Sequence, residues 1–161
     1  MRQPDLKFLL AHPAHFIALG FGSGLAPKGP GTAGTLLAWL LFPLLTAIVS
    51  GTALLIVLLA GFVLGVFVAD RTGKALGVSD HGAIVWDEMV PFWLVLFFTP
   101  ATLGWQAAAF VLFRFFDIVK PQPVGWADSK VKGGFGVMLD DVIAAGYTLL
   151  VLAIAMQFLA H

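Results

Sequence analysis

Acidic and basic side chains that could bind a metal ion and a phosphate group are concentrated between Arg114 and Asp141. This stretch contains four of the nine acidic residues and four of the nine basic residues of the chain. They are Asp117, Asp128, Asp140, Asp141, Arg114, Lys120, Lys130 and Lys132. Carboxylates bind hard cations such as Mg²⁺, and Lys and Arg side chains bind phosphate oxygens. The stretch is therefore either a site of phosphoryl chemistry or a solvated connection between two helices.

A second acidic group, Asp80, Asp87 and Glu88, precedes the apolar run that starts at Met89. Ionisable groups are costly next to apolar membrane segments, which favours a functional reading of such acids. The alternative is that acids in a first helical turn complement the helix dipole. That alternative covers the adjacent pairs at 87–88 and 140–141, but not Asp117, which follows its apolar segment. Adjacent residues on a helix point about 100° apart, so one acid of each pair is expected to face inward.

A glycine-rich segment, residues 21–35, leads into the first long apolar run. Free backbone N–H groups at the start of a helix attract anions, so Lys28 and Thr32 are candidate phosphate-binding residues beside Lys120 and Lys130. The alternative is a flexible entry loop that permits close helix packing. Its formal G-x-G-x-x-G match does not predict a dinucleotide site, because no strand precedes it.

The composition predicts an integral membrane protein. Of the 161 residues, 60% are hydrophobic and 11% are charged, whereas soluble domains carry about 25% charged residues. A soluble helical bundle would have too few polar residues to cover its core. Zero net charge argues against a nucleic-acid partner, and the absence of cysteine excludes disulfides and thiolate-bound zinc. Residues 1–161 are expected to form one membrane-embedded domain.

The apolar runs predict an all-α membrane bundle of about five short transmembrane helices. The runs are residues 35–50, 53–69, 89–101, 104–118 and 142–160. A single kinked span over 89–116 is the alternative to two helices there. Residues 1–20 are expected to form a helix on the membrane surface, or a tail packed on the protein.

The positions of the charges set the expected topology. Every Lys, Arg, Asp and Glu lies in residues 1–28, 70–88 or 114–141. With five crossings all three segments reach one face of the membrane, and the positive-inside rule places that face in the cytoplasm. The sequence leaves the oligomeric state open, a homo-oligomer included.

Three polar segments together resemble the bacterial phosphatidylglycerophosphatase A family. They read GFGSGLAPKGPGTAGT, DHGAIVWDEMV and FRFFDIVKPQPVGWADSKVKGGFGVMLDDVIAAGY. The F-D-x-x-K-P-x-P and G-G-x-G-x-M-x-D-D elements are the specific ones. One departure from the family pattern is Pro91, where the family is expected to have glycine.

The resemblance implies a multi-pass, Mg²⁺-dependent phosphatase of the bacterial inner membrane. Such an enzyme converts phosphatidylglycerophosphate into phosphatidylglycerol and phosphate, with its active site facing the cytoplasm and membrane lipids around it. The matching site positions here are Asp80, Asp87, Glu88, Asp117, Lys120, Asp128, Lys130, Asp140 and Asp141.

Our hypothesis for the roles has three parts. Asp87 or Glu88, with Asp117 and Asp140 or Asp141, holds Mg²⁺. Lys120 and Lys130, with Lys28, Thr32 and the amides of the glycine-rich segment, stabilise the charge of the phosphoryl group. Asp80 or Asp128 positions the attacking water. The alternative is a membrane transport or assembly subunit without catalysis, which should carry ionisable residues deep within its spans.

Overall fold

The computed structural model describes residues 3–159, and within that range the chain forms helices and no strand. The elements are α1 (Leu6–Ala11), α2 (Pro13–Ala18), the 3₁₀ helix η1 (Gly20–Leu25), α3 (Pro30–Ile48), α4 (Gly51–Leu76), α5 (Trp86–Phe98), α6 (Leu103–Val119), α7 (Val124–Lys130) and α8 (Gly133–Leu159). The predicted all-α fold is confirmed.

Three helices are long and apolar enough to cross a membrane: α3, α4 and α8. Helices α5 and α6 lie where two further spans were predicted, but they have 13 and 17 residues. At 1.5 Å per residue, α5 is about 20 Å long, less than a hydrocarbon core of about 30 Å. The helices mark a membrane protein, and the count of five crossings stays a prediction.

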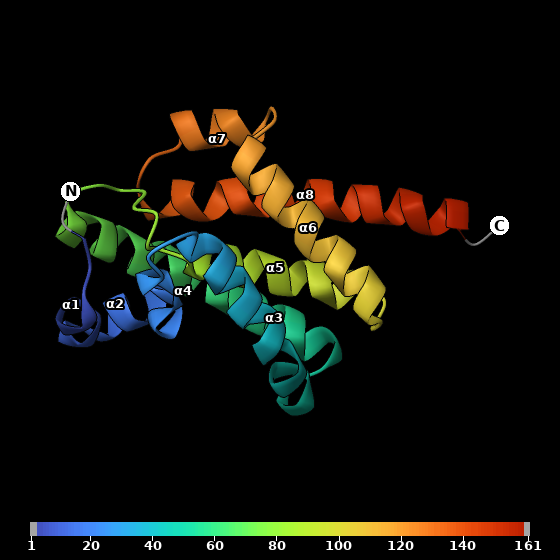
Figure 1. Ribbon diagram of the computed structural model, residues 1–161, viewed down its shortest axis with the longest axis horizontal. Helices are drawn as coiled ribbons and strands as arrows, with labels where there is room; N and C mark the ends of the chain where they lie inside the picture. The colour runs from blue at the N-terminus through green and yellow to red at the C-terminus, as the bar shows by residue number, and fades with distance from the viewer. Residues whose placement is uncertain (1–2, 160–161) are drawn as a thin grey trace.

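Helix α8 is the central element of the bundle and packs against α4, α5, α6 and α7 (Figure 1). The short helices α1, α2 and α7 and the α4–α5 loop gather at one end, at the left of Figure 1. The α3–α4 and α5–α6 turns lie toward the opposite end. We call the end with α1, α2, α7 and the α4–α5 loop the charged end, because the charged residues within 3–159 lie in the segments that reach it.

Helix α8 begins well before the start that the apolar pattern predicts, and close packing at glycine is the reason. Helix α8 starts at Gly133, and Gly134 lies against the backbone of Val66, where a side chain would collide with the carbonyl. Close packing on α4 therefore extends α8 into the polar stretch. Asp140 and Asp141 lie about two turns inside the helix, so the helix-dipole explanation is wrong for them. It remains available for Asp87 and Glu88, in the first turn of α5.

The N-terminal segment forms two short helices instead of one. His12 ends α1 and caps α2, with its Nδ1 accepting a hydrogen bond from the N–H of Ala14 at 3.0 Å. Phe8 and Leu9 are buried, and α2 packs on α4, so the segment is docked on the protein. Leu6 and Leu10 are exposed, and a position at the membrane surface stays a prediction.

Candidate active site

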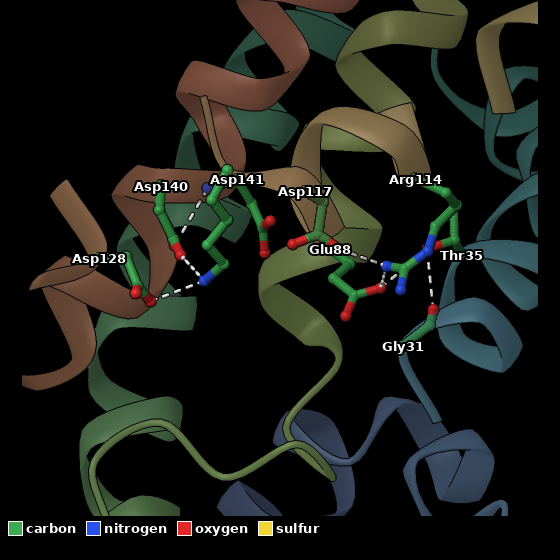
Figure 2. A network of polar contacts seen from close by, with 9 residues as sticks. Gly31, Thr35, Glu88, Arg114, Asp117, Asp128, Asp140 and Asp141 are labelled. Carbon is green, nitrogen blue, oxygen red and sulfur yellow. Dashed lines mark hydrogen bonds and ion pairs between the residues drawn. The ribbon is translucent and has the colours of Figure 1, made fainter. Parts of the chain in front are cut away.

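Arg114 organises the first part of the site, where α3, α5 and α6 meet (Figure 2). Its guanidinium forms ion pairs with Glu88 on α5 and with Asp117, one turn further along α6 at 2.5 Å. The three side chains are only 11–13% exposed. The C-terminal end of α6 carries partial negative charge, which disfavours the Asp117 carboxylate, and the ion pair with Arg114 compensates for this. We call these three residues the Arg114 network.

The glycine-rich segment meets this network through the first turns of α3. Thr35 Oγ1 lies 3.0 Å from Glu88 Oε2 and 2.9 Å from the Gly31 carbonyl, so one hydroxyl proton serves two acceptors. A side chain at Gly31 would collide with the Glu88 carboxylate. Glycine lets the α3 backbone lie directly against the Glu88 carboxylate, a catalytic candidate. Thr35, which the sequence reasoning did not select, makes the contact, and Thr32 is half-buried without a role in it.

Lys120 organises the second part of the site, between α6, α7 and α8. Its Nζ donates to Asp128 Oδ1 at 2.6 Å and to Asp140 Oδ2 at 2.7 Å. Lys120 ends α6 in the left-handed conformation, which directs its side chain back toward α8. Burial alone would lower the pKa of Lys120, but these two hydrogen bonds outweigh burial and raise the pKa above its usual value. Lys120, Asp128 and Asp140 form the Lys120 network.

Asp87 and Asp141, which we call the central acids, lie within electrostatic range of acids in both networks, and neither forms an ion pair within residues 3–159. Both are buried, and among residues 3–159 the Oδ1 atoms of both have no hydrogen-bond partner. Asp141 is within electrostatic range of Asp87 and of acids in both networks. Figure 2 shows its carboxylate between Asp140 on one side and Asp117 on the other.

The expectation that one acid of each pair faces inward was wrong. Asp87, Glu88, Asp140 and Asp141 are all 9% exposed or less. The reason is that the charged end encloses both helices: Glu88 faces α3 and α6, and Asp140 faces the Lys120 side chain. A rotation of 100° along either helix still points into the protein.

Asp80 and Asp128 line one cavity of ≈ 250 Å³ between the α4–α5 loop and the start of α8. Asp80 is at the surface, yet desolvation of its carboxyl by the surrounding loop raises its pKa, against the opposing charge of Lys120. The neighbouring His81 is buried, and its Nδ1 accepts the Ala83 N–H at 3.1 Å, so this ring stabilises the loop.

Two predicted phosphate-binding residues do not join these networks. Lys28 and Lys130 are exposed, and neither takes part in an ion pair within the described part of the chain. Arg114 takes the buried cationic position instead. The sequence contained a signal for it, because Arg114 lies three residues before Asp117, the spacing of facing side chains on a helix.

The donor chemistry of the central acids fits Mg²⁺. Among residues 3–159 no group of three or more His, Cys, Asp or Glu side chains is arranged so that it could hold a metal ion by itself. Mg²⁺, however, usually takes one or two carboxylates and completes its shell with water and substrate phosphate. Asp87 and Asp141, each with a buried carboxylate oxygen that has no partner, could supply these one or two protein ligands.

Pro91, the departure from the family pattern, does not interrupt α5, which continues to Phe98. A proline has no N–H for the carbonyl four residues earlier, so the Asp87 carbonyl lacks its intrahelical donor.

The family model described as phosphatidylglycerophosphatase A matches residues 16–156. The chain belongs to this family. It is 45% identical over 150 residues to phosphatidylglycerophosphatase A of Haemophilus influenzae, covering 92% of this chain and 91% of the relative. The protein of that name from Escherichia coli is 43% identical, over 86% of this chain and 80% of the relative.

A third relative bears another name. A candidate phosphatidylinositol-3-phosphatase of Bacteroides thetaiotaomicron is 42% identical over 146 residues, which are 86% of this chain and 91% of the relative. No solved structure matches the chain. All three relatives are named for removing a phosphate from a membrane lipid, and the two names differ in the headgroup.

Proposed function

We propose that this protein is a phosphatidylglycerophosphatase that hydrolyses the terminal phosphate monoester of phosphatidylglycerophosphate. The observation that carries the proposal is the pair of buried central acids within electrostatic range of both the Arg114 and the Lys120 networks, in a chain of this family. A cluster of this kind suits a phosphate dianion, because cations bind its oxygens and carboxylates hold a metal beside it.

Arg114 and Lys120 are the residues we assign to the phosphate oxygens. Each already neutralises two carboxylates, so each has donors fixed in place by buried neighbours. The buried Nε of Arg114 has no partner among the described residues and is a spare donor. Preorganised donors of this kind stabilise the charge that develops on a transferring phosphoryl group.

Asp87 and Asp141 are the residues we assign to the metal. When bound there, Mg²⁺ would neutralise the phosphate and lower the pKa of an attacking water. Glu88, Asp117 and Asp140 are held by cations in the two networks, so we assign them to positioning those cations. The proposed metal ligands are thus reduced from the five acids suggested by the sequence to Asp87 and Asp141.

The hydrolytic step needs a proton acceptor for the water and a donor for the leaving alcohol. The water oxygen forms a bond to phosphorus, the P–O bond to glycerol breaks, and its electron pair stays on the glycerol oxygen, which takes up a proton. Asp80 and Asp128 share the cavity at the charged end and are the acceptor candidates. Asp80 is the better one, because its pKa is raised by desolvation and it forms no ion pair within residues 3–159, whereas Asp128 is paired with Lys120.

We further propose that the charged end faces the cytoplasm of a bacterial inner membrane. The Lys and Arg residues within 3–159 lie in segments that reach this end, and short positively charged loops are retained on the cytoplasmic side. A cysteine introduced at exposed Lys130 should then be labelled by a membrane-impermeant maleimide only after the cells are opened.

The direct test is phosphate release by the purified protein in detergent micelles. We expect release from phosphatidylglycerophosphate with Mg²⁺ and none with EDTA, with phosphatidylinositol 3-phosphate as the second substrate. Asp70→Asn is the matched control, since Asp70 forms only an exposed pair with Lys74. Faster release from phosphatidylinositol 3-phosphate would show that the inositol lipid, and not phosphatidylglycerophosphate, is the preferred substrate. Release that persists in EDTA would refute the metal assignment, and no release from either lipid would favour the non-catalytic alternative.

A further inference from the structure

A groove with an entirely apolar lining lies between α4, α5 and α8. Its volume is ≈ 350 Å³, and its lining residues are Leu55, Leu58, Leu59, Phe62, Val90, Pro91, Leu94 and Val142. Leu58 and Val90 form a buried floor, at 5% and 4% exposure, whereas Leu59 on the rim is 65% exposed. The groove therefore opens on the outer surface of the bundle, among the helices that are long and apolar enough to cross a membrane.

On α5 and α8, the first lining residues of the groove follow the central acids by three residues and by one residue along the chain. On α5, Val90, Pro91 and Leu94 follow Asp87 by three, four and seven residues, so they continue the helix face on which Asp87 lies. On α8, Val142 directly follows Asp141. Two helices thus pass from a buried, unpartnered carboxylate to the wall of an apolar groove within about one turn.

We infer that this groove binds an acyl chain of the phosphorylated lipid substrate and thereby places the headgroup at the central acids. The inference rests on the proposed function and deepens it. Along α5 and α8 the polar site comes first and the apolar groove follows. A lipid with a phosphate at one end and a hydrocarbon chain at the other has the same order of polar and apolar parts. Binding energy from the chain would orient the phosphate for reaction.

The position of the groove favours a lipid chain as its occupant. Two of its three walls, α4 and α8, are helices long and apolar enough to cross a membrane, where hydrocarbon chains are the surrounding medium. The phosphate site at one end of the groove distinguishes the substrate from bulk lipid, whose headgroups have no such partner.

Helix α4 offers a matched pair of variants for the test. Leu59 and Ile56 are 65% and 64% exposed on the same helix, but only Leu59 lines the groove. We expect Leu59→Trp to lower kcat/KM for dioleoyl phosphatidylglycerophosphate about tenfold, because the indole displaces several methylenes from the groove. For the dihexanoyl substrate, whose chains are too short to fill it, the change should stay below about twofold. Ile56→Trp should change neither value. Equal effects of the two variants on the long-chain substrate would overturn the inference, as would equal losses on both substrates in Leu59→Trp.

A second readout separates failure of this inference from failure of the proposed function. Phosphatidic acid with a photoreactive acyl chain is crosslinked to the wild-type protein in detergent, and the labelled peptides are mapped. Labelling concentrated on 55–62 and 90–94, and stronger than with phosphatidylcholine carrying the same chain, would support the groove even if no phosphate were released. Equal labelling by the two lipids, or labelling spread over the lipid-facing helices, would show ordinary boundary lipid and refute it. Normal phosphate release with that uniform labelling would leave the proposed function standing alone.

Discussion

The acids of the charged end fall into two groups that differ in what surrounds them. Glu88 and Asp140 are buried, Asp117 has a side chain 13% exposed, and each of the three forms an ion pair with Arg114 or Lys120. Asp87 and Asp141 are also buried and lie within electrostatic range of both networks, yet their Oδ1 atoms have no partner within residues 3–159. The same end of the same bundle therefore satisfies one set of carboxylates and leaves the other unsatisfied.

This difference separates positioning from chemistry. A buried carboxylate oxygen without a partner is costly, so a fold that contains two of them is less stable than it could be. Such local costs concentrate at functional sites, where the groups are needed for binding or catalysis. The paired acids stabilise the surrounding helices, and the central acids are the ones available to a ligand.

The largest effect on folding is expected when the Arg114 network is broken. Arg114→Gln leaves Glu88 and Asp117 buried beside a neutral amide, so the free energy of unfolding should fall by about 3 kcal/mol. Denaturant unfolding in detergent, followed by tryptophan fluorescence, measures the change. Adding Glu88→Gln and Asp117→Asn should recover much of the loss, because no uncompensated charge remains. A triple variant as unstable as Arg114→Gln would show that packing of the arginine, and not its charge, holds these helices.

The Lys120 network should contribute less, since Lys120 and Asp128 are 27% and 37% exposed. Lys120→Met is expected to lower the free energy of unfolding by about 1 kcal/mol. The pKa of Lys120 in the folded protein is raised above its usual 10.5. Its contribution to stability is therefore fully present below pH 10.5 and is lost only as the pH rises toward the raised pKa. The difference in stability between wild type and variant should therefore be flat from about pH 7 to 9. A difference that vanishes within this range would contradict the assigned pairing.

The smallest effects are expected at the exposed lysines. Lys28→Ala and Lys130→Ala should each change stability by less than about 0.5 kcal/mol. They should leave kcat within about twofold and raise KM for the anionic lipid by up to about fivefold at low salt, since each lysine attracts anionic lipid. A hundredfold lower kcat in Lys130→Ala would instead restore this residue to the phosphate site that the sequence suggested.

The helical fold and the gathering of the acids at one end of the bundle could be predicted from the sequence, because both depend on local patterns. Apolar runs mark the helices, and confinement of charge to three segments places the acids together. It could not separate Glu88 from Asp87, since their neighbours come from α3 and α6, distant in the chain. Nor could it reveal the early start of α8, which depends on contact between Gly134 and α4. Lys130 was selected by residue type, whereas Arg114 and Thr35 acquire their roles only through the packing of helices.

The most direct measurement compares activity and stability in Asp87→Asn and Asp141→Asn. We predict that each substitution lowers kcat for phosphatidylglycerophosphate at least about 100-fold. The unfolding temperature in the same detergent should be unchanged or higher, because the amide removes a buried charge that no cation compensates. Near-normal kcat in either folded variant, or a loss of activity that accompanies unfolding, would contradict the assignment of the chemistry to these two residues.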